Sequence, residues 1–368
     1  MAAILKYFRP TSVSCHGCSD KRKYEESGGC LGKNRYLGIL SLILLLLALH
    51  LAVIMQPPEP IFDEQYYVPS ALSILHGTGT DRTEHPPLGQ LIIASGIKCF
   101  GDNPFGWRFF SVLFGIAGVA IFYFICLSLQ MKAKYAFIAA FLLSFENLTF
   151  VQSGIAMLDV FSLTFMLGSL WLYLHGRYNL AGISAGLATL VKLSGILVLL
   201  LIVLHWLLNN RKKVKPVVIG IAIVCATIFL LLPLFDLIIW HKWLNPFSQI
   251  ATMLDINSGS TFAKYPSDML SRPWDWFIHP VILTYWTDPH YLAMISPPVW
   301  ALIIPVSMFT CYQAFKGNAV AVFTSIWLTS MGFIWILLNL VTDRSTYIYY
   351  FSFCWGRLHI NFAGFVGI

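Results

Sequence analysis

The chain has 368 residues, of which 57% are hydrophobic and only 11% carry a charge. Soluble domains are roughly 45–50% apolar and about 25% charged, so this composition excludes an ordinary soluble enzyme, a disordered protein and a nucleic-acid-binding domain. A mean hydropathy of +0.71 over the whole length predicts an all-α polytopic membrane protein. The net charge of +7 does not indicate nucleic acid, because the basic residues cluster at the ends of apolar runs.

A helix that crosses the bilayer needs about 20 mainly apolar residues. The first run of that kind is Leu37–Met55, which follows a polar tail of residues 1–36. Its length and its distance from the N-terminus predict a retained helix rather than a cleaved signal peptide. Further uncharged runs that predict spans are Phe109–Met131, Pro216–Phe235, Tyr291–Phe315 and Gly317–Thr342.

Two regions predict broken helices. Between Tyr135 and Leu174, two apolar stretches are interrupted near Glu146 and Gly154, which predicts a tight helix–turn–helix. The run from 180 to 208 is too short for two full crossings at about 1.5 Å per residue. It therefore predicts a pair of short helices that meet near Lys192, an arrangement tolerated where the break is buried in protein or lines a wet cavity.

Lysine and arginine near span ends indicate the cytoplasmic side. They cluster in the N-terminal tail, at 132–134 and at 211–215, and Lys316 stands alone. If all lie in the cytoplasm, two sizeable loops at 56–104 and 241–296 lie outside. The chain then divides into the cytoplasmic tail and a membrane domain of about 9–11 helices over residues 37–368. Most carboxylates fall in the outer loops or in the membrane, which indicates an outward-facing site.

The eight cysteines are scattered and do not form a secreted disulfide framework. Cys15, His16, Cys18 and Cys30 resemble half of a zinc site, but a closed site needs four ligands at suitable spacing. The histidines and carboxylates of the loop 241–296 match no metal motif. We therefore expect no obligatory metal and no resident cofactor.

The outer loop 56–104 carries two motifs. A Phe-Asp-Glu element lies at 62–64, just after the first span, and Glu84 and a His-Pro-Pro-Leu-Gly element at 85–89 follow about twenty residues later. Each motif alone is unspecific, because surface carboxylate pairs are usually solvated and a His before two prolines is often only a rigid turn. Together they resemble the dolichyl-phosphate-mannose protein mannosyltransferase family, within the membrane glycosyltransferases of the GT-C fold. The details resemble archaeal or bacterial members.

The resemblance covers roughly residues 37–351. Further elements that resemble the family are Gly-Trp-Arg at 106–108, Ala-Met-Leu-Asp at 156–159, the Gly-rich segment 182–195 with a single Lys, Arg-Pro-Trp at 272–274 and the Tyr-rich segment 346–351. Three features depart from the family pattern. Gln90 stands where the family usually has Lys, and Gly154 stands where an Arg is common. The segment 354–368 is polar for a terminal span, so we expect a truncated or altered C-terminus.

The resemblance implies transfer of mannose from a polyprenyl phosphate to Ser or Thr hydroxyls of exported protein, with inversion of the anomeric centre. A positioned carboxylate that takes the hydroxyl proton contributes typically about 10²–10⁴-fold. The resemblance gives this role to Asp63, with Glu64 as its support or substitute. We expect contacts to the donor phosphate or substrate for Glu84, His85, Arg108, Asp159, Lys192 and Arg344. Arg344 is included because it follows the span Gly317–Thr342 at its outer end, and Asp159 is expected to orient the base or an Arg.

For several of these residues, the chemistry alone leaves an alternative open. Arg108 and Arg344 lie at span ends, where an arginine often only extends its charged group to the membrane–water interface. Lys192 within an apolar run predicts either a phosphate contact or an ion pair with Asp159. His85 predicts either a substrate contact or a shaped loop.

Two rival functions remain beside the mannosyltransferase. One shares the fold but moves another sugar, such as aminoarabinose, to a lipid or glycan. The other is a secondary transporter, although transporters tend to have internal repeats and this chain has none that we recognise. The expected partners are a polyprenyl-phosphate sugar, an acceptor protein and membrane lipid, without nucleic acid. The expected location is the cell membrane of a prokaryote, or the endoplasmic reticulum in a eukaryote.

Overall fold

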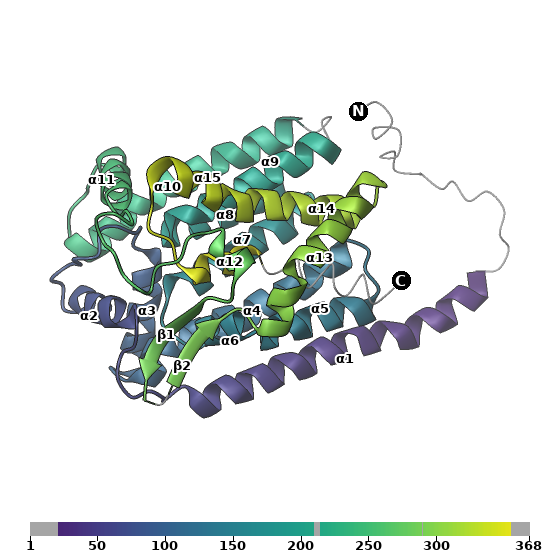
Figure 1. Cartoon of the computed structure of the whole chain (residues 1–368), viewed down its shortest axis with the longest axis horizontal. Helices are drawn as coiled ribbons and strands as arrows, with labels where there is room; N and C mark the ends of the chain where they lie inside the picture. The colour runs from purple at the N-terminus through teal and green to yellow at the C-terminus, as the bar shows by residue number, and fades with distance from the viewer. Residues whose placement is uncertain (1–20, 210–213, 289, 355–368) are drawn as a thin grey trace.

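One long helix, α1 (Lys21–Val53), contains the apolar run and also the second part of the predicted polar tail, and it extends along the lower side of the molecule (Figure 1). The computed structural model describes residues 21–209, 214–288 and 290–354. Leu37, Leu40 and Leu44 on α1 are exposed, as suits a helix that faces lipid. Residues 1–20 with Cys15, His16 and Cys18, and the polar end of the chain from 355 onward, lie outside the described residues.

Within the described residues, five helical segments are long and apolar enough to cross a membrane. They are Tyr36–Val53 of α1, α4 (Pro104–Ser128), α10 (Val214–Trp240), α13 (Pro297–Phe315), and the continuous segment of α14 (Ala319–Leu328), η3 (Thr329–Phe333) and α15 (Ile334–Thr342). A sixth candidate is the pair α5 (Ala133–Phe145) and α6 (Asn147–Ser153), which is bent by 68°. The protein is thus a multi-pass membrane protein.

The remaining apolar helices are shorter: α3 (Leu88–Phe100), α7 (Leu158–Leu174), α8 (Tyr178–Val191) and α9 (Leu197–Asn209), the last preceded by η2 (Leu193–Ile196). Both predicted breaks are present. Glu146 is extended, and its carboxylate caps α6 by accepting the Thr149 N–H at 3.0 Å. Lys192 is extended between α8 and η2.

Close packing around α8 depends on glycine. The helix packs against both α7 and α10. A Cβ at Gly182 would lie 2.4 Å from the Gly220 carbonyl oxygen, and a Cβ at Gly186 would lie 2.6 Å from Cβ of Thr227. The Gly-rich segment therefore lets α8 approach α10 at backbone distance.

The loops at 56–104 and 241–296 are largely structured. The first contains α2 (Glu64–Leu75) and α3, and the second contains α11 (Pro246–Ser258), α12 (Asp275–Ile278) and two strands. Figure 1 shows α2, α11 and the strands at one end of the molecule, where α1 also ends. The last described element, η4 (Ile348–Cys354), packs against the second strand and η3.

The strands correct two expectations. β1 (Ile282–Thr287) and β2 (His290–Met294) form an antiparallel pair in which Ile282 lies opposite Met294. The fold is therefore not purely helical. The predicted span Tyr291–Phe315 begins only at Pro297, because residues 291–294 belong to β2 and Pro297 is the first residue of α13.

Candidate active site

A cavity of about 640 Å³ lies where the first loop, α11 and the segment before η4 meet. Its wall combines charged side chains with several tyrosines. The charged residues of the wall are Asp63, Arg82, Glu84, Lys192, Lys264 and Arg344. Five of the predicted site residues line it: Asp63, Glu84, His85, Lys192 and Arg344.

Asp63 lies at the N-terminus of α2, where its carbonyl oxygen accepts the N–H groups of Tyr66 and Tyr67 at 3.0 Å. The preceding residue, Phe62, has a φ of 47°, a conformation that a bulky side chain rarely adopts. Its ring stacks on Tyr285 with a centroid distance of 4.3 Å. This anchor directs the Asp63 carboxylate to the cavity, and among the described residues it has no hydrogen-bond or ion-pair partner.

The surroundings of Asp63 suit a general base. Burial raises the pKa of its carboxyl to about 7, the charge of Lys192 opposes this shift, and the charges of Asp159 and Glu84 add to it. A base works best when its pKa is close to the working pH, so Asp63 is well matched to proton transfer near neutrality.

Glu64 faces the opposite way from Asp63. Its carboxylate forms a two-pronged ion pair with Arg108, with Nε–Oε1 and Nη2–Oε2 distances of 2.9 and 2.7 Å. Both side chains are completely buried. Glu64 also accepts the backbone N–H groups of Ala156 at 2.7 Å and of Ile61 at 3.1 Å.

The rest of the Arg108 guanidinium is occupied by the backbone after α1. It donates to four carbonyl oxygens at 2.9–3.2 Å, those of Ile54, Gln56, Pro57 and Glu59. The geometry therefore favours a positioning role for Arg108 and Glu64. They shape the backbone beside Asp63, whereas the resemblance implied a phosphate contact for Arg108 and a catalytic part for Glu64.

Lys192 and Asp159 form a second buried pair. Lys192 Nζ lies 2.8 and 2.9 Å from the two carboxylate oxygens of Asp159. The same ammonium group lies 4.7 Å from the ring centre of Tyr350 and lines the cavity, whereas Asp159 does not. Lys192 was predicted to form either a phosphate contact or an ion pair with Asp159. The ion pair is present, and it holds the Lys192 ammonium group at the cavity wall, where a ligand can also reach it.

His85 is a neutral imidazole in this site. Burial, together with the charges of Lys192 and Arg344, lowers its pKa to about 3. It can therefore contact a ligand by hydrogen bonds but adds no positive charge.

Arg344 reaches the cavity from the far end of the chain. Its guanidinium donates to Asn257 of α11, to the carbonyl oxygen at 3.0 Å and to Oδ1 at 2.8 Å. Asn257 donates in turn to the Glu84 carbonyl oxygen at 2.7 Å. This chain of contacts holds three distant segments together around the cavity.

Sequence reasoning missed Arg82, Lys264 and Asn257. Arg82 and Lys264 lie in the loops 56–104 and 241–296, which were both predicted to lie on the outer side of the membrane. This common location was the only feature of the sequence that pointed to them. The Tyr-rich segment was noted for its resemblance alone, yet Tyr347, Tyr349 and Tyr350 form one wall of the cavity.

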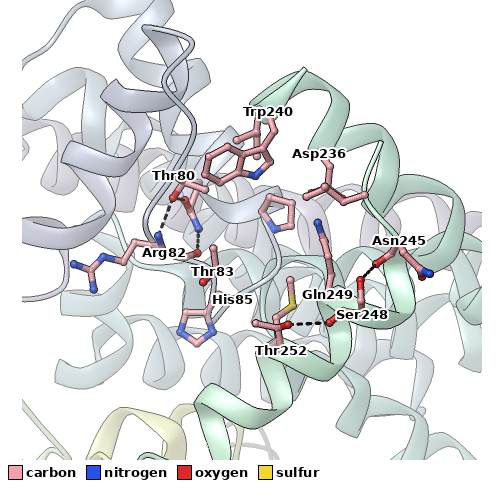
Figure 2. A pocket seen from close by; sticks show the side chains of 15 residues that line it. Thr80, Arg82, Thr83, His85, Asp236, Trp240, Asn245, Ser248, Gln249 and Thr252 are labelled. Carbon is pink, nitrogen blue, oxygen red and sulfur yellow. Dashed lines mark hydrogen bonds between the residues drawn. The ribbon is translucent and has the colours of Figure 1, made fainter. Parts of the chain in front are cut away.

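A second cavity of about 250 Å³ adjoins the first and shares Arg82 and His85 with it. Figure 2 shows it between the loop 80–87, the end of α10 and α11, with Asp236, Gln249 and Trp240 on its wall. Gln90, a departure from the family pattern, also lines it and is fully buried. In the part of the chain that the structure describes, no cluster of three or more His, Cys, Asp or Glu residues could hold a metal ion.

Comparisons with known proteins identify several membrane glycosyltransferases that this chain resembles. A family model described as dolichyl-phosphate-mannose-protein mannosyltransferase matches residues 84–240. A polyprenol-phosphate-mannose–protein mannosyltransferase of Mycobacterium tuberculosis is 37% identical over 123 residues, which cover 32% of this chain and 23% of that protein. An undecaprenyl phosphate-α-4-amino-4-deoxy-L-arabinose arabinosyl transferase of Pseudomonas fluorescens is 25% identical over 270 residues, or 67% of this chain and 44% of that one.

Among solved structures, ArnT from Cupriavidus metallidurans in the apo state matches with a TM-score of 0.58 and 17% identity. The match covers 88% of this chain and 59% of that one. This chain therefore has the GT-C fold, and the resemblance to the mannosyltransferase family is confirmed over the matched segment. The chain spans less than two thirds of the length of each of these relatives.

Proposed function

We propose that this multi-pass membrane protein with the GT-C fold is a glycosyltransferase that uses a polyprenyl-phosphate sugar as donor. In the form we favour, the sugar is mannose and the acceptors are Ser and Thr hydroxyls of exported protein. The matches to polyprenol-phosphate-mannose–protein mannosyltransferases support the choice of mannose. The donor's phosphate is a good leaving group once its charge is stabilised, so no metal is needed for this step.

The proposed step is a single displacement. The acceptor oxygen forms a bond to the anomeric carbon while Asp63 takes the hydroxyl proton. The bond between that carbon and the phosphate oxygen breaks, and the phosphate leaves with the electron pair. Attack from the face opposite the leaving group inverts the anomeric centre.

The observation that carries this proposal is the unpaired Asp63 carboxylate in a cavity with a positive balance. The wall has four basic side chains, those of Arg82, Lys192, Lys264 and Arg344, against the two carboxylates of Asp63 and Glu84. Fixed cations beside a phosphate stabilise the charge that grows on it as the bond breaks, which is usually the largest single contribution to catalysis.

A specific observation also favours a second candidate, transfer of aminoarabinose from the same type of lipid carrier. The arabinosyl transferase matches extend over 67% and 69% of this chain, about twice the share of the mannosyltransferase matches. Asp63 as base and the basic side chains of the cavity wall would serve both reactions equally. The two candidates are therefore distinguished by which donor sugar the protein transfers.

We further propose that the cavity faces the outside of the cell membrane, or the lumen of the endoplasmic reticulum, with the N-terminus in the cytoplasm. In this arrangement, residues 37–368 act as one transferase domain. The basic clusters at 132–134 and 211–215 support this orientation, because such clusters mark the cytoplasmic side.

The experiment that tests the proposed function offers the purified chain polyprenyl-phosphate-mannose and polyprenyl-phosphate-aminoarabinose in separate reactions. A Ser/Thr-rich peptide and a preparation of membrane lipids and glycans serve as acceptors. Mannosylation of the peptide supports the favoured form, and transfer of aminoarabinose to a lipid or glycan supports the second. Absence of transfer in every combination, by a folded chain, contradicts both.

A further inference from the structure

We infer that Arg82 is the residue that binds the phosphate of the donor lipid in the 640 Å³ cavity, and that Gln90 positions it there. This inference rests on the proposed function, because it names the anion-binding residue of the same site. It begins with a comparison of the basic side chains around the cavity.

Most of these side chains are already engaged by protein groups. Lys192 is paired with Asp159, and Arg344 donates two hydrogen bonds to Asn257. Arg272, in the loop 241–296, donates from Nη1 to Asn339 Oδ1 at 2.8 Å and to Asp343 Oδ1 at 2.6 Å. Lys264 is exposed on its loop, with Nζ 5.3 Å from the ring centre of Tyr265.

Arg82 differs from Lys192, Arg344 and Arg272 in its partners, and from the exposed Lys264 in being half-buried. Among the described residues its guanidinium has a single charged neighbour, Asp81, at 3.5 Å, and that carboxylate is largely exposed. Such a surface pair contributes little. Nε of Arg82 is buried and has no hydrogen-bond partner there. The guanidinium lies 4.5 Å from the ring centre of Tyr66. Guanidinium groups commonly bind phosphate through two parallel N–H bonds.

The backbone of Arg82 is held in place by buried polar groups. Gln90 Nε2 donates to the Arg82 carbonyl oxygen at 2.9 Å, and the Arg82 N–H donates to Thr80 Oγ1 at 3.0 Å. The Ser70 and Thr80 hydroxyl oxygens lie 2.6 and 2.7 Å from Gln90 Oε1, which accepts from them, and the two hydroxyls are also in contact with each other. Each hydroxyl has one hydrogen, so two of these three contacts are hydrogen bonds at any one time. Ser70, Thr80 and Gln90 are all buried.

Figure 2 shows the result of this arrangement. The backbone of Arg82 borders the smaller cavity, whereas its guanidinium extends away from Asp236 and Gln249. Arg82 also lines the larger cavity with Asp63, and its charge lowers the pKa of the Asp63 carboxyl. Gln90 is uncharged, but its hydrogen bond to the Arg82 backbone holds the loop that carries the positive charge of Arg82.

The test measures binding of undecaprenyl phosphate and of uncharged undecaprenol to the purified full chain in nanodiscs. Wild type should bind the phosphate more tightly than the alcohol. Arg82→Gln should weaken binding of the phosphate about ten- to a hundredfold, as expected for loss of hydrogen bonds to a charged group, and leave binding of the alcohol unchanged. Arg82→Lys should recover part of the loss.

Two variants complete the test. Gln90→Leu, which removes the clamp but no charge, should weaken phosphate binding several-fold without changing alcohol binding. Arg177→Gln removes an exposed arginine from the α7–α8 connection and should bind both lipids as wild type does. A thermal melt of each variant shows that it is folded.

The outcomes separate this inference from the proposed function. Equal phosphate binding by wild type and Arg82→Gln, or no preference of wild type for the phosphate, overturns the role of Arg82. Phosphate binding that depends on Arg82 in a chain that transfers no sugar supports the inference and contradicts the transferase. If wild type transfers sugar and the donor KM of Arg82→Gln is unchanged, the proposed transferase function is supported and the role of Arg82 is contradicted.

Discussion

Asp63 and Glu64 are neighbours in the chain, but their carboxylates have different surroundings. Glu64 is fully buried against Arg108 and two backbone N–H groups, whereas Asp63 faces the cavity without a partner among the described residues. The start of α2 produces this difference, because consecutive residues there point in different directions. One carboxylate therefore stabilises the loop while the other is available for proton transfer.

The first prediction concerns the pH dependence of transfer. Below its pKa of about 7, Asp63 carries the proton and cannot accept another, so kcat/KM should fall about tenfold per pH unit as the pH drops from 7 toward 5. Initial rates at low donor concentration across this range measure the effect. A profile that stays flat down to pH 5 would contradict Asp63 as the base.

The second prediction uses the two charges that act on Asp63 with opposite sign. The positive charge of Lys192 lowers the pKa of Asp63, and the negative charge of Asp159 raises it. In Lys192→Met the acid limb of the profile should therefore move to higher pH, and in Asp159→Asn it should move to lower pH. If both variants shift the limb in the same direction, the electrostatic account of Asp63 is wrong.

The third prediction concerns the buried ion pair. Arg108→Met leaves the Glu64 carboxylate buried without its partner, which should cost about 3–5 kcal/mol of stability. The double variant Arg108→Met/Glu64→Gln should recover part of this loss, and Arg177→Met should have no effect. Thermal unfolding of the purified chains measures all three. A stable Arg108→Met variant with a raised donor KM would instead favour a phosphate contact for Arg108.

At the scale of elements, α8 illustrates how small residues set the distance between helices. Gly182 approaches the Gly220 carbonyl oxygen so closely that an added methyl group has no room. Gly168 on α7 faces only the Ser184 hydroxyl, at 3.1 Å from an added Cβ, and that side chain can turn away. The two sites therefore allow the same substitution to be compared in two settings.

The fourth prediction follows from this comparison. Gly182→Ala should destabilise the protein by about 1–3 kcal/mol, the usual cost of overpacking a core, and Gly168→Ala should change it by less than half as much. Thermal unfolding again measures the difference. Equal melting temperatures for the two variants would show that α8 and α10 can separate at little cost.

Some of the fold could be predicted from the sequence, because polar residues within apolar runs leave a clear signal. The breaks at Glu146 and Lys192 are confirmed for this reason. The hairpin β1–β2 could not be predicted, since its residues are as apolar as the span that follows them. Within the described residues, α7, α8 and α9 are apolar but shorter than a full span.

The site was predictable to a similar extent. The motifs indicated Asp63, Glu84 and His85, and the positions of Lys192 within an apolar run and of Arg344 after a span indicated those two. All five line one cavity. Arg82 could not be found because nothing in its spacing distinguishes it from a surface arginine. Its significance depends on hydrogen bonds from Ser70, Thr80 and Gln90, which only the folded loop brings together.

At the scale of the whole molecule, the cavity joins parts of the chain that are almost 300 residues apart. Asp63 comes from the first loop, Asn257 from α11 and Arg344 from the segment after α15. The hydrogen bonds from Arg344 to Asn257, and from Asn257 to the Glu84 backbone, connect these parts. The site therefore forms only when both loops meet at the same end of the bundle.

The most direct test of the central claim compares sugar transfer by wild type, Asp63→Asn and Asp268→Asn in membranes with equal amounts of each chain. Asp268 is an exposed carboxylate of the second loop that does not line the cavity. The account predicts transfer from polyprenyl-phosphate-mannose by wild type and Asp268→Asn, and a loss of at least about 100-fold in Asp63→Asn. Equal transfer by wild type and Asp63→Asn would contradict it.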